Sequence, residues 1–258
     1  MIKAIFFDID GTLVSFKTHQ VPESARQAIA ELKAKGIKVF IATGRHLSAI
    51  NNLGDLEFDG YITLNGSYCF VGKNKVIYKH GIVKQNLANL LDYMDAGNEI
   101  PCIFVREHDM IINYIDNRVK EMLELLNFPH PPIGNLRETL QEDIFQLIAF
   151  FGTNQEEEVM KIIPDCDATR WSPLFTDVVP KGSSKRIGID KVIEYYGIGL
   201  EETMAFGDGG NDIPMLQHAG IGVAMGNAAY DVKGWADFVT TSVDDDGILK
   251  ALKTLKIL

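Results

Sequence analysis

The stretch AIFFDIDGTLV, residues 4–14, places an apolar run directly before two carboxylates, Asp8 and Asp10. A short, continuous apolar run is typical of a strand that is buried on both faces of a parallel sheet. Two carboxylates that lie two residues apart repel each other, and each raises the pKa of the other. We therefore expect a bound cation where the chain leaves this strand.

The same alternation of apolar strand and amphipathic helix continues on both sides of a different central region. Apolar residues at helical spacing predict an amphipathic helix that ends at Gly36. The strand KVFIAT comes next, and the strand YITL follows. The later elements are a helix over 184–196, the strand TMAF, a helix over 212–218, the strand GIGVAM, a helix over 228–236, the strand DFVTT and a helix over 247–255. This alternation predicts an α/β fold, a doubly wound Rossmann-like parallel sheet.

The central region follows another pattern. Amphipathic helices over 84–98, 117–126 and 155–163 alternate with strands that read as hairpins, for example CIFVREHDMIINYI. Strand pairs flanked by helices predict an α+β unit whose sheet is covered on one face. We expect a discontinuous core domain of residues 1–81 and 182–258, and an inserted domain of residues 82–181.

Composition excludes several classes of function. The net charge of the 258-residue chain is −10, which disfavours nucleic acid and anionic membranes as partners. The six histidines and three cysteines show no zinc-type spacing, and the scattered cysteines suit a reducing compartment. We find no secretory signal and no 18-residue apolar span, so we expect a cytoplasmic protein.

Ligand sites of doubly wound sheets lie at the carboxyl ends of the strands, where four polar stretches of this chain should meet. In the first, Asp8 could act as a nucleophile that forms an aspartyl-phosphate, and Asp10 as the general acid and base. An all-oxygen site of this kind suits Mg²⁺. The alternative for these residues is an ordinary turn, in which Asp and Gly are common.

The second and third stretches could hold a phosphate. The Thr43 hydroxyl and the backbone N–H groups near Gly44 can bind a phosphate oxygen, although Thr-Gly is also a common turn. Ser184 is a good N-cap, which places Lys185 at the start of a helix. A cation there opposes the helix dipole, so a neighbouring anion is favoured. Lys181 is the rival for this role, and a solvated lysine is the common alternative for both.

The fourth stretch is FGDGGND, residues 206–212. Asp208 ends a buried strand and could be a further metal ligand. Asn211 is either an N-cap or a phosphate donor. Asp212 either orients Lys185 or a metal-bound water, or only complements the helix dipole.

Together these stretches resemble the four motifs of the haloacid dehalogenase superfamily of phosphohydrolases. YITLNGSYCF and GIGVAMGNA are similar to stretches of its Cof-type subfamily of bacterial sugar-phosphate phosphatases. The resemblance implies that Asp8 attacks phosphorus and that Asp10 is the acid/base. It also implies two sets of binding residues: Mg²⁺ held by the Asp8 side chain, the Asp10 backbone carbonyl and Asp208, and the phosphoryl group held by Thr43, Lys185 and Asn211.

The position of the inserted domain adds to the resemblance. Too few residues separate Asp10 from Thr43 for a folded domain, whereas the insertion lies between Arg45 and Lys185. In the superfamily this placement implies a C2-type cap of the C2B form, which closes over the crevice. Arg170 and Trp171 of the cap could contact substrate, or be a solvated charge and a core residue.

The sequence thus predicts a Mg²⁺-dependent phosphatase of small phosphorylated metabolites, with sugar phosphates as the first choice. One alternative is a phosphomutase of the phosphomannomutase type, and another is a non-catalytic binding or regulatory protein on the same fold. Phosphonate cleavage is disfavoured because its cap would lie between Asp10 and Thr43. We expect a monomer or a small homo-oligomer.

Overall fold

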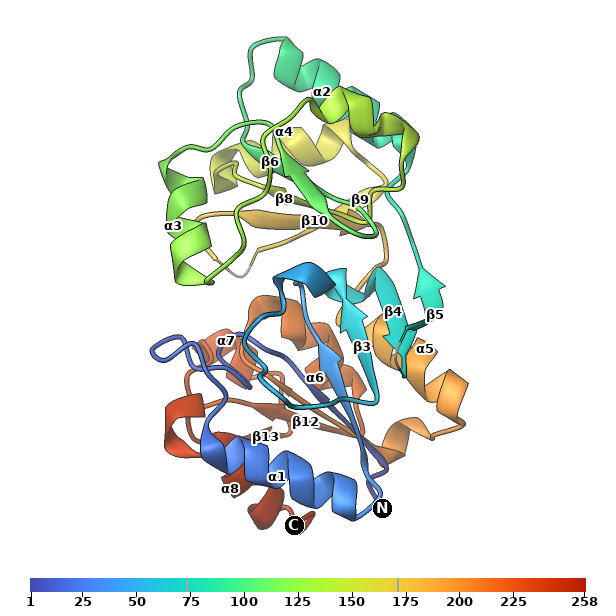
Figure 1. Ribbon diagram of the computed structural model, residues 1–258, viewed down its shortest axis with the longest axis vertical. Coiled ribbons are helices and arrows are strands. Elements are labelled where there is room, and N and C mark those ends of the chain that lie inside the picture. Colours follow the sequence, from blue (N-terminus) through green and yellow to red (C-terminus); the bar gives the residue numbers. More distant parts are fainter. Residues whose placement is uncertain (73, 171) are drawn as a thin grey trace. The chain divides into compact units, whose positions relative to one another are not determined.

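The computed structural model of the protein describes residues 1–72, 74–170 and 172–258. They form two compact units, one of Met1–Arg45, Ile50–Tyr78 and Ser184–Leu258, the other of His46–Ala49 and Lys79–Ser183 (Figure 1). The sequence placed residues 46–49 in the core domain. In the structure they join the second unit, where His46 Nε2 lies 3.1 Å from the Glu107 carbonyl oxygen.

The first unit is built on a sheet centred on β1 (Ala4–Phe7). Among the described residues it has eight strands in the order β13-β12-β11-β1-β2-β3-β4-β5. β1 runs parallel to both β2 and β11, and β4 pairs antiparallel to β3. The other strands are β2 (Lys38–Ala42), β3 (Gly60–Thr63), β4 (Tyr68–Val71), β5 (Lys75–Lys79), β11 (Thr203–Gly207), β12 (Ile221–Ala224) and β13 (Phe238–Val239). The predicted α/β fold class is confirmed.

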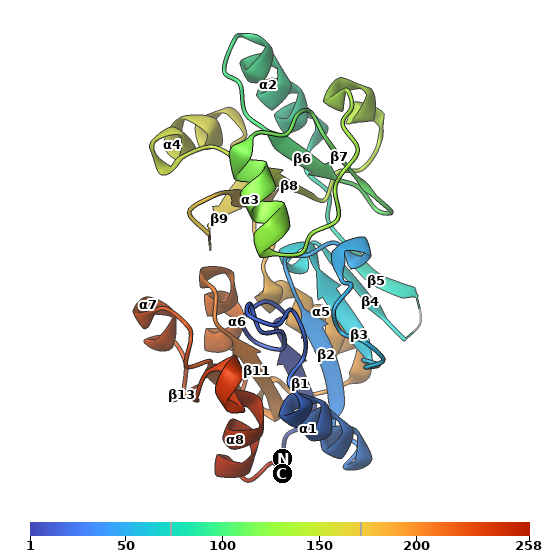
Figure 2. The same cartoon turned by 60° about the vertical axis from the view of Figure 1, so that its left-hand side comes forward.

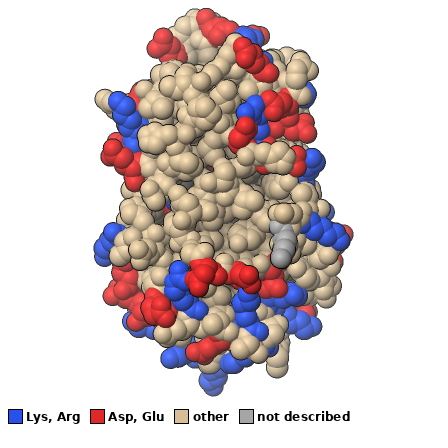
Figure 3. Space-filling model, in the orientation of Figure 1, with Lys and Arg blue, Asp and Glu red and all other residues tan. Residues whose placement is uncertain are grey.

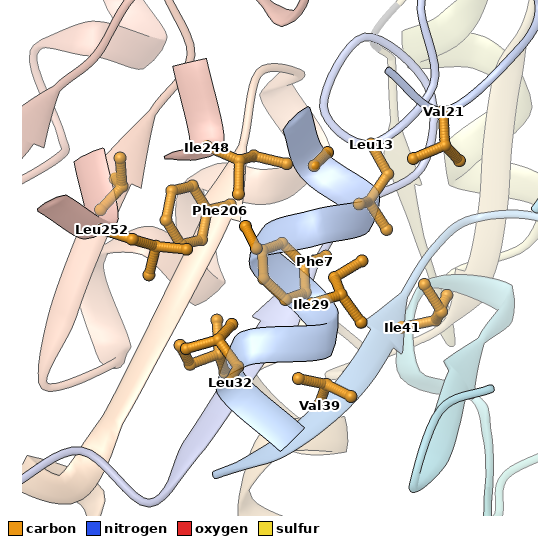
Figure 4. Close-up of a cluster of buried hydrophobic side chains, with 14 of the residues drawn as sticks. Phe7, Leu13, Val21, Ile29, Leu32, Val39, Ile41, Phe206, Ile248 and Leu252 are labelled. Atoms are coloured by element: carbon orange, nitrogen blue, oxygen red, sulfur yellow. The ribbon is translucent and has the colours of Figure 1, made fainter. Parts of the chain in front are cut away.

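Helices cover both faces of this sheet because every β1 residue is apolar. Ile5 and Phe7 pack with α1 (Glu23–Ala34) and α8 (Gly247–Thr254), and Figure 4 shows this cluster. Figure 2 shows α1 and α8 on the same side of the sheet. Ala4 and Phe6 point to the other face, toward α5 (Lys185–Tyr196) and α6 (Ile213–His218). Alternate burial on two faces explains the continuous apolar run.

Two predicted elements are less than half as long as expected. The helix predicted over 228–236 is α7 (Tyr230–Lys233), which begins after the extended residue Ala229 and ends at its C-cap, Gly234. The strand DFVTT is reduced to β13, which pairs with the end of β12. Short one-turn helices fill several connections: η2 (Leu64–Gly66), η4 (Leu200–Glu202), η5 (Gly210–Asp212) and η6 (Val243–Asp245).

The second unit has an antiparallel sheet, which in the described part of the chain has the strand order β7-β6-β8-β10-β9. The apolar side chains of α2 (Lys84–Asp95) and Val159 of α4 (Thr153–Ile162) bury one face of the sheet. The other elements are β6 (Cys102–Val105), β7 (Met110–Ile112), α3 (Asn117–Leu125), η1 (Leu47–Ala49), η3 (Leu136–Gln141), β8 (Gln146–Ala149), β9 (Cys166–Thr169) and β10 (Thr176–Pro180). This arrangement is the predicted α+β insertion.

The face drawn in Figure 3 carries Lys and Arg side chains mixed with Asp and Glu. Several surface charges of the second unit are paired: Arg106 contacts Asp109 and Glu142, and Arg137 contacts Asp92 and Asp95. Within residues 1–72, 74–170 and 172–258, we find no helix long and apolar enough to cross a membrane.

Candidate active site

The carboxyl end of β1 carries the first two candidate residues into a tight loop. Asp8 follows Phe7, and its side chain is 9% exposed. Its N–H donates to the Phe206 carbonyl at 3.0 Å, so the neighbouring strand β11 fixes its backbone. Gly11 has a φ of +82°, and a Cβ there would lie 2.2 Å from Asp208 Oδ2. Only glycine lets the loop approach Asp208 this closely.

Lys185 lies between two carboxylates at the start of α5. Its Nζ donates to Asp8 Oδ1 at 2.6 Å and to Asp212 Oδ1 at 2.5 Å, and the side chain is fully buried. Ser184 caps the helix by accepting from the Ile187 N–H at 3.5 Å. Burial alone would lower the pKa of Lys185, but the carboxylates of Asp212 and Asp8 raise it above its ordinary value. The lysine is therefore a fixed positive charge at the strand ends.

Lys181, the rival lysine, lies in the second unit. Its exposed Nζ is 3.4 Å from the Pro164 carbonyl oxygen. Lys185, by contrast, is held within the group of candidate carboxylates.

Asp212 is held on both of its carboxylate oxygens. Oδ1 accepts from Lys185, and Oδ2 accepts from the backbone N–H groups of Asp208 and Gly209, each at 2.9 Å. Gly207 makes room for this turn, because a Cβ there would lie 2.5 Å from the Asp212 Cβ. Asp212 thus ties the loop after β11 to the start of α5.

Asp8, Asp208 and Asp212 form the group of carboxylates that could hold a metal ion, with oxygens within 4.8 Å of one another. Burial, followed by the charge of Asp212, raises the pKa of Asp8 to about 7. Burial and the charge of Asp8 raise the pKa of Asp208 well above its ordinary value. The single ammonium of Lys185 does not offset three carboxylates, so the donor set fits a divalent cation that prefers oxygen ligands.

Asp10 points to a different partner. The Arg45 guanidinium forms a two-pronged ion pair with it, Nε to Oδ2 at 2.7 Å and the second nitrogen to Oδ1 at 2.6 Å. Both side chains are largely buried: that of Arg45 is 5% exposed and that of Asp10 is 13% exposed. Such a fork fixes the plane of the carboxylate as well as its position. No role was expected of Arg45 from the sequence.

The strand-end corner after β2 lies beside this ion pair. Thr43 is buried, and its hydroxyl accepts from the Arg45 N–H at 3.1 Å. Gly44 lies half-buried between the two. The Thr43 carbonyl accepts from the Asn65 N–H at 3.1 Å, and Asn65 Oδ1 accepts from Asn211 Nδ2 at 2.9 Å. These bonds connect the ends of β2, β3 and β11.

All eight candidate residues thus lie in the first unit. Sequence reasoning missed Thr12, Arg45, Asn65 and Asn227, each of which touches a candidate residue directly. Asn65 and Asn227 follow the strands YITL and GIGVAM. Because the carboxyl ends of the strands meet at the site, this position would have identified both as candidate site residues.

Arg170 was expected to be a solvated surface charge or a substrate contact. It is 15% exposed, pairs with Glu156 at 2.9 Å, and donates to the carbonyls of Phe175 and Phe151. The solvated interpretation is therefore wrong. Trp171 lies outside the described residues.

Comparison with known proteins gives consistent matches. Residues 5–252 match the family of haloacid dehalogenase-like hydrolases. YkrA of Bacillus subtilis (strain 168), named as a candidate phosphatase, is 41% identical over 258 residues, 99% of this chain and 98% of that protein. The 5-amino-6-(5-phospho-D-ribitylamino)uracil phosphatase YitU of the same organism is 28% identical over 264 residues, 96% of each chain. The solved structure of the HAD subclass IIB sugar phosphatase BT4131 has a TM-score of 0.93 at 48% identity, covering 99% of this chain and 100% of that one.

Proposed function

The chain belongs to the haloacid dehalogenase-like hydrolase family and is a phosphatase, and from this premise we propose that it hydrolyses small sugar phosphates with Mg²⁺ through an aspartyl-phosphate on Asp8. The likeness to a sugar phosphatase at 48% identity supports this substrate class. The likeness to YitU, which acts on a different phosphate ester, is weaker at 28% identity.

The observation that carries the proposal is the unequal use of the two oxygens of Asp8. Oδ1 accepts from Lys185 at 2.6 Å, while Oδ2 has no hydrogen-bond partner among the described residues. One oxygen therefore anchors the carboxylate, and the other keeps its lone pairs for attack on phosphorus. A carboxylate that attacks a phosphate ester forms a covalent intermediate, which water then hydrolyses.

The side chains of Asp8 and Asp208 and the backbone carbonyl of Asp10 would hold Mg²⁺. When bound, the cation would supply the positive charge that lets an anionic carboxylate approach an anionic phosphate. Asp212 has both oxygens engaged, so its role is to hold Lys185 and the Asp208 backbone. The excess of buried carboxylates over cations supports this assignment.

The phosphoryl oxygens would be bound by groups on the remaining strand ends. Lys185 supplies a fixed ammonium, Thr43 supplies a hydroxyl, and Gly44 supplies a backbone N–H just after β2. Asn211 supplies an amide from the loop after β11. Donors that are already in place stabilise the charge that develops in the transition state without reorganising.

Asp10 is the proposed proton carrier. It would give a proton to the leaving sugar oxygen and later take one from the attacking water. The two-pronged contact with Arg45 holds this carboxylate in place at the strand ends. The first step needs a protonated carboxyl, so the fork must loosen when substrate is bound.

The test is phosphate release from a panel of phosphorylated metabolites, with Mg²⁺ and with EDTA. We expect kcat/KM to be highest for sugar phosphates and turnover to stop in EDTA and return with Mg²⁺. A phosphomutase would release little phosphate and need a bisphosphate activator, and a non-catalytic protein would release none. The cytoplasmic location and the monomeric or small homo-oligomeric state stay predictions.

A further inference from the structure

One exposed asparagine ties three loops of the site together. Asn227 lies in the loop after β12, and its Nδ2 donates to the Gly11 carbonyl at 2.8 Å and to Asp208 Oδ2 at 3.1 Å. Its Oδ1 accepts from the Val243 N–H at 3.0 Å. The side chain is exposed, so core packing does not account for these contacts.

The contacts of Asn227 complete the fixation of Asp208. The other oxygen of Asp208, Oδ1, accepts from the Thr12 hydroxyl at 2.8 Å. One donor on each oxygen restrains the orientation of the carboxylate, and each oxygen keeps a further lone pair. Gly11 allows the loop to approach Oδ2, because a Cβ at this position would lie 2.2 Å from that oxygen.

We propose that Asn227 is a positioning residue for Mg²⁺, acting by fixing the Asp208 carboxylate, an inference that rests on the proposed Mg²⁺ site. Groups that hold a metal ligand in place typically contribute a factor of 10–100 to metal affinity when they are removed. Asn227→Ala removes the donor to Asp208 and leaves Thr12 in place.

The experiment measures the rise in Tm of the chelator-treated full chain as Mg²⁺ alone is added, without substrate. We expect the half-saturating Mg²⁺ concentration of Asn227→Ala to rise about 10–100-fold. Asn227→Gln keeps the amide but displaces it, and should show a smaller rise. Asn98→Ala is the matched control, since it removes one asparagine hydrogen bond, to the Tyr93 carbonyl in the second unit, and should not change the midpoint.

A kinetic readout separates positioning from general damage. The activity of Asn227→Ala should recover as Mg²⁺ is raised, which a merely unfolded fraction would not do. An unchanged midpoint in Asn227→Ala, with wild type responding, overturns the inference and leaves the proposed function intact. If Asn227→Ala does not fold, an unchanged midpoint in Asn227→Gln has the same meaning. Absence of any Mg²⁺ response in wild type overturns the metal part of the proposed function and the inference with it.

A separate observation, a run of left-handed residues, concerns the phosphate side. Leu64, Asn65 and Gly66 have φ values of +53°, +51° and +91°, although the first two carry side chains. Such strain persists only where surrounding contacts impose it, and it gathers at functional sites. All three residues are buried.

This turn contacts three segments that are proposed to bind phosphate: the end of β2, the start of α5 and, through the Asn211–Asn65 hydrogen bond, the loop after β11. The Leu64 N–H donates to the Arg45 carbonyl at 3.3 Å, and the Asn65 N–H donates to the Thr43 carbonyl at 3.1 Å. At Gly66 a Cβ would lie 2.0 Å from the Ser184 carbonyl oxygen, so the turn abuts the start of α5. We infer that Asn65 positions the Asn211 amide for the phosphoryl group, which again rests on the proposed function.

Two substitutions at Asn65 separate the amide from the strain. Asn65→Gly removes the acceptor of Asn211 and relaxes the left-handed backbone, whereas Asn65→Ala removes the same acceptor and keeps the strain. Both should weaken inhibition by inorganic phosphate and raise KM, each about tenfold, with kcat changed less. Only Asn65→Ala should lower Tm, and neither should shift the Mg²⁺ midpoint.

Equal phosphate inhibition in wild type and Asn65→Gly would overturn this role of the amide. A loss seen in Asn65→Ala alone would also overturn it, because the strained backbone would then be responsible. If wild type releases no phosphate from any ester, the proposed function fails instead, which the wild-type assay alone reveals.

Discussion

The loop after β1 and the loop after β11 each offer Lys185 one carboxylate, at 2.6 Å from Asp8 and 2.5 Å from Asp212. The two differ in their second oxygen. The second oxygen of Asp212 accepts hydrogen bonds from two backbone N–H groups. The second oxygen of Asp8 has no hydrogen-bond partner in the part of the chain that the structure describes. Asp8 and Asp212 therefore share Lys185 but differ in function: Asp212 has a structural role, whereas Asp8 keeps an oxygen that can react.

The largest expected effect is that of Asp8→Asn. The amide keeps the size of the side chain but removes the nucleophile, so kcat should fall on the order of 10⁴-fold or more. Steady-state phosphate release measures this, with circular dichroism as the check on folding. Near-wild-type kcat in this variant would reverse the assignment of the two carboxylates.

Replacement of Lys185 should lower kcat/KM about a hundredfold. Lys185→Met keeps the buried stem but removes a fixed donor to the phosphoryl group, which lowers kcat/KM by about 10²-fold. Because Lys185 is fully buried between Asp8 and Asp212, the variant should also be less stable. Lys181→Met is the matched control and should stay within about twofold of wild type. The opposite ranking would show that the phosphate-binding lysine is Lys181.

Asp212→Asn should affect stability as well as rate. Its new NH₂ group would face either the Lys185 ammonium or the two backbone N–H groups, and neither arrangement satisfies all donors. We expect the free energy of unfolding to fall by about 1–3 kcal/mol and kcat to fall about 10–100-fold. Urea denaturation and phosphate release measure the two. A loss of rate as large as that of Asp8→Asn would remove the distinction between the two carboxylates.

The smallest effect is a pH dependence of the metal-free protein. Burial and Asp212 raise the pKa of Asp8 from 3.8 to about 7, so the folded state binds a proton more tightly than the unfolded chain. Stability from this group is therefore present below pH 4 and is lost as pH rises toward 7. In EDTA, Tm should drop by a few degrees across this window, and Asp8→Asn should make the drop smaller. An identical pH profile in both proteins would contradict the cause assigned to the shift.

The sequence predicted the parts of the fold that periodicity encodes. The run before Asp8 became β1, and the helical stripe ending near Gly36 became α1 with the expected buried face. It failed where pairing depends on distant residues, as at β13, whose length is set by its contact with β12.

The candidate site divides in the same way. Asp8, Lys185 and Asp208 stand at strand or helix ends that can be read from the chain. The ion pair of Arg45 with Asp10 and the hydrogen bond of Asn227 with Asp208 join residues that are far apart in the sequence. The local sequence does not predict such contacts, because a polar residue after a strand is also typical of an ordinary turn. The full burial of Lys185 likewise follows from its tertiary contacts and not from its position at a helix start.

Locating the phosphoryl group during turnover tests the nucleophilic role of Asp8 most directly. Wild-type protein with Mg²⁺ and a turned-over sugar phosphate is quenched in acid within milliseconds, and its peptides are mapped by mass spectrometry. We expect a phosphoryl adduct on Asp8, with none on Asp212 and none in Asp8→Asn. An adduct on Asp212, or steady turnover with no adduct on any carboxylate, would contradict this role.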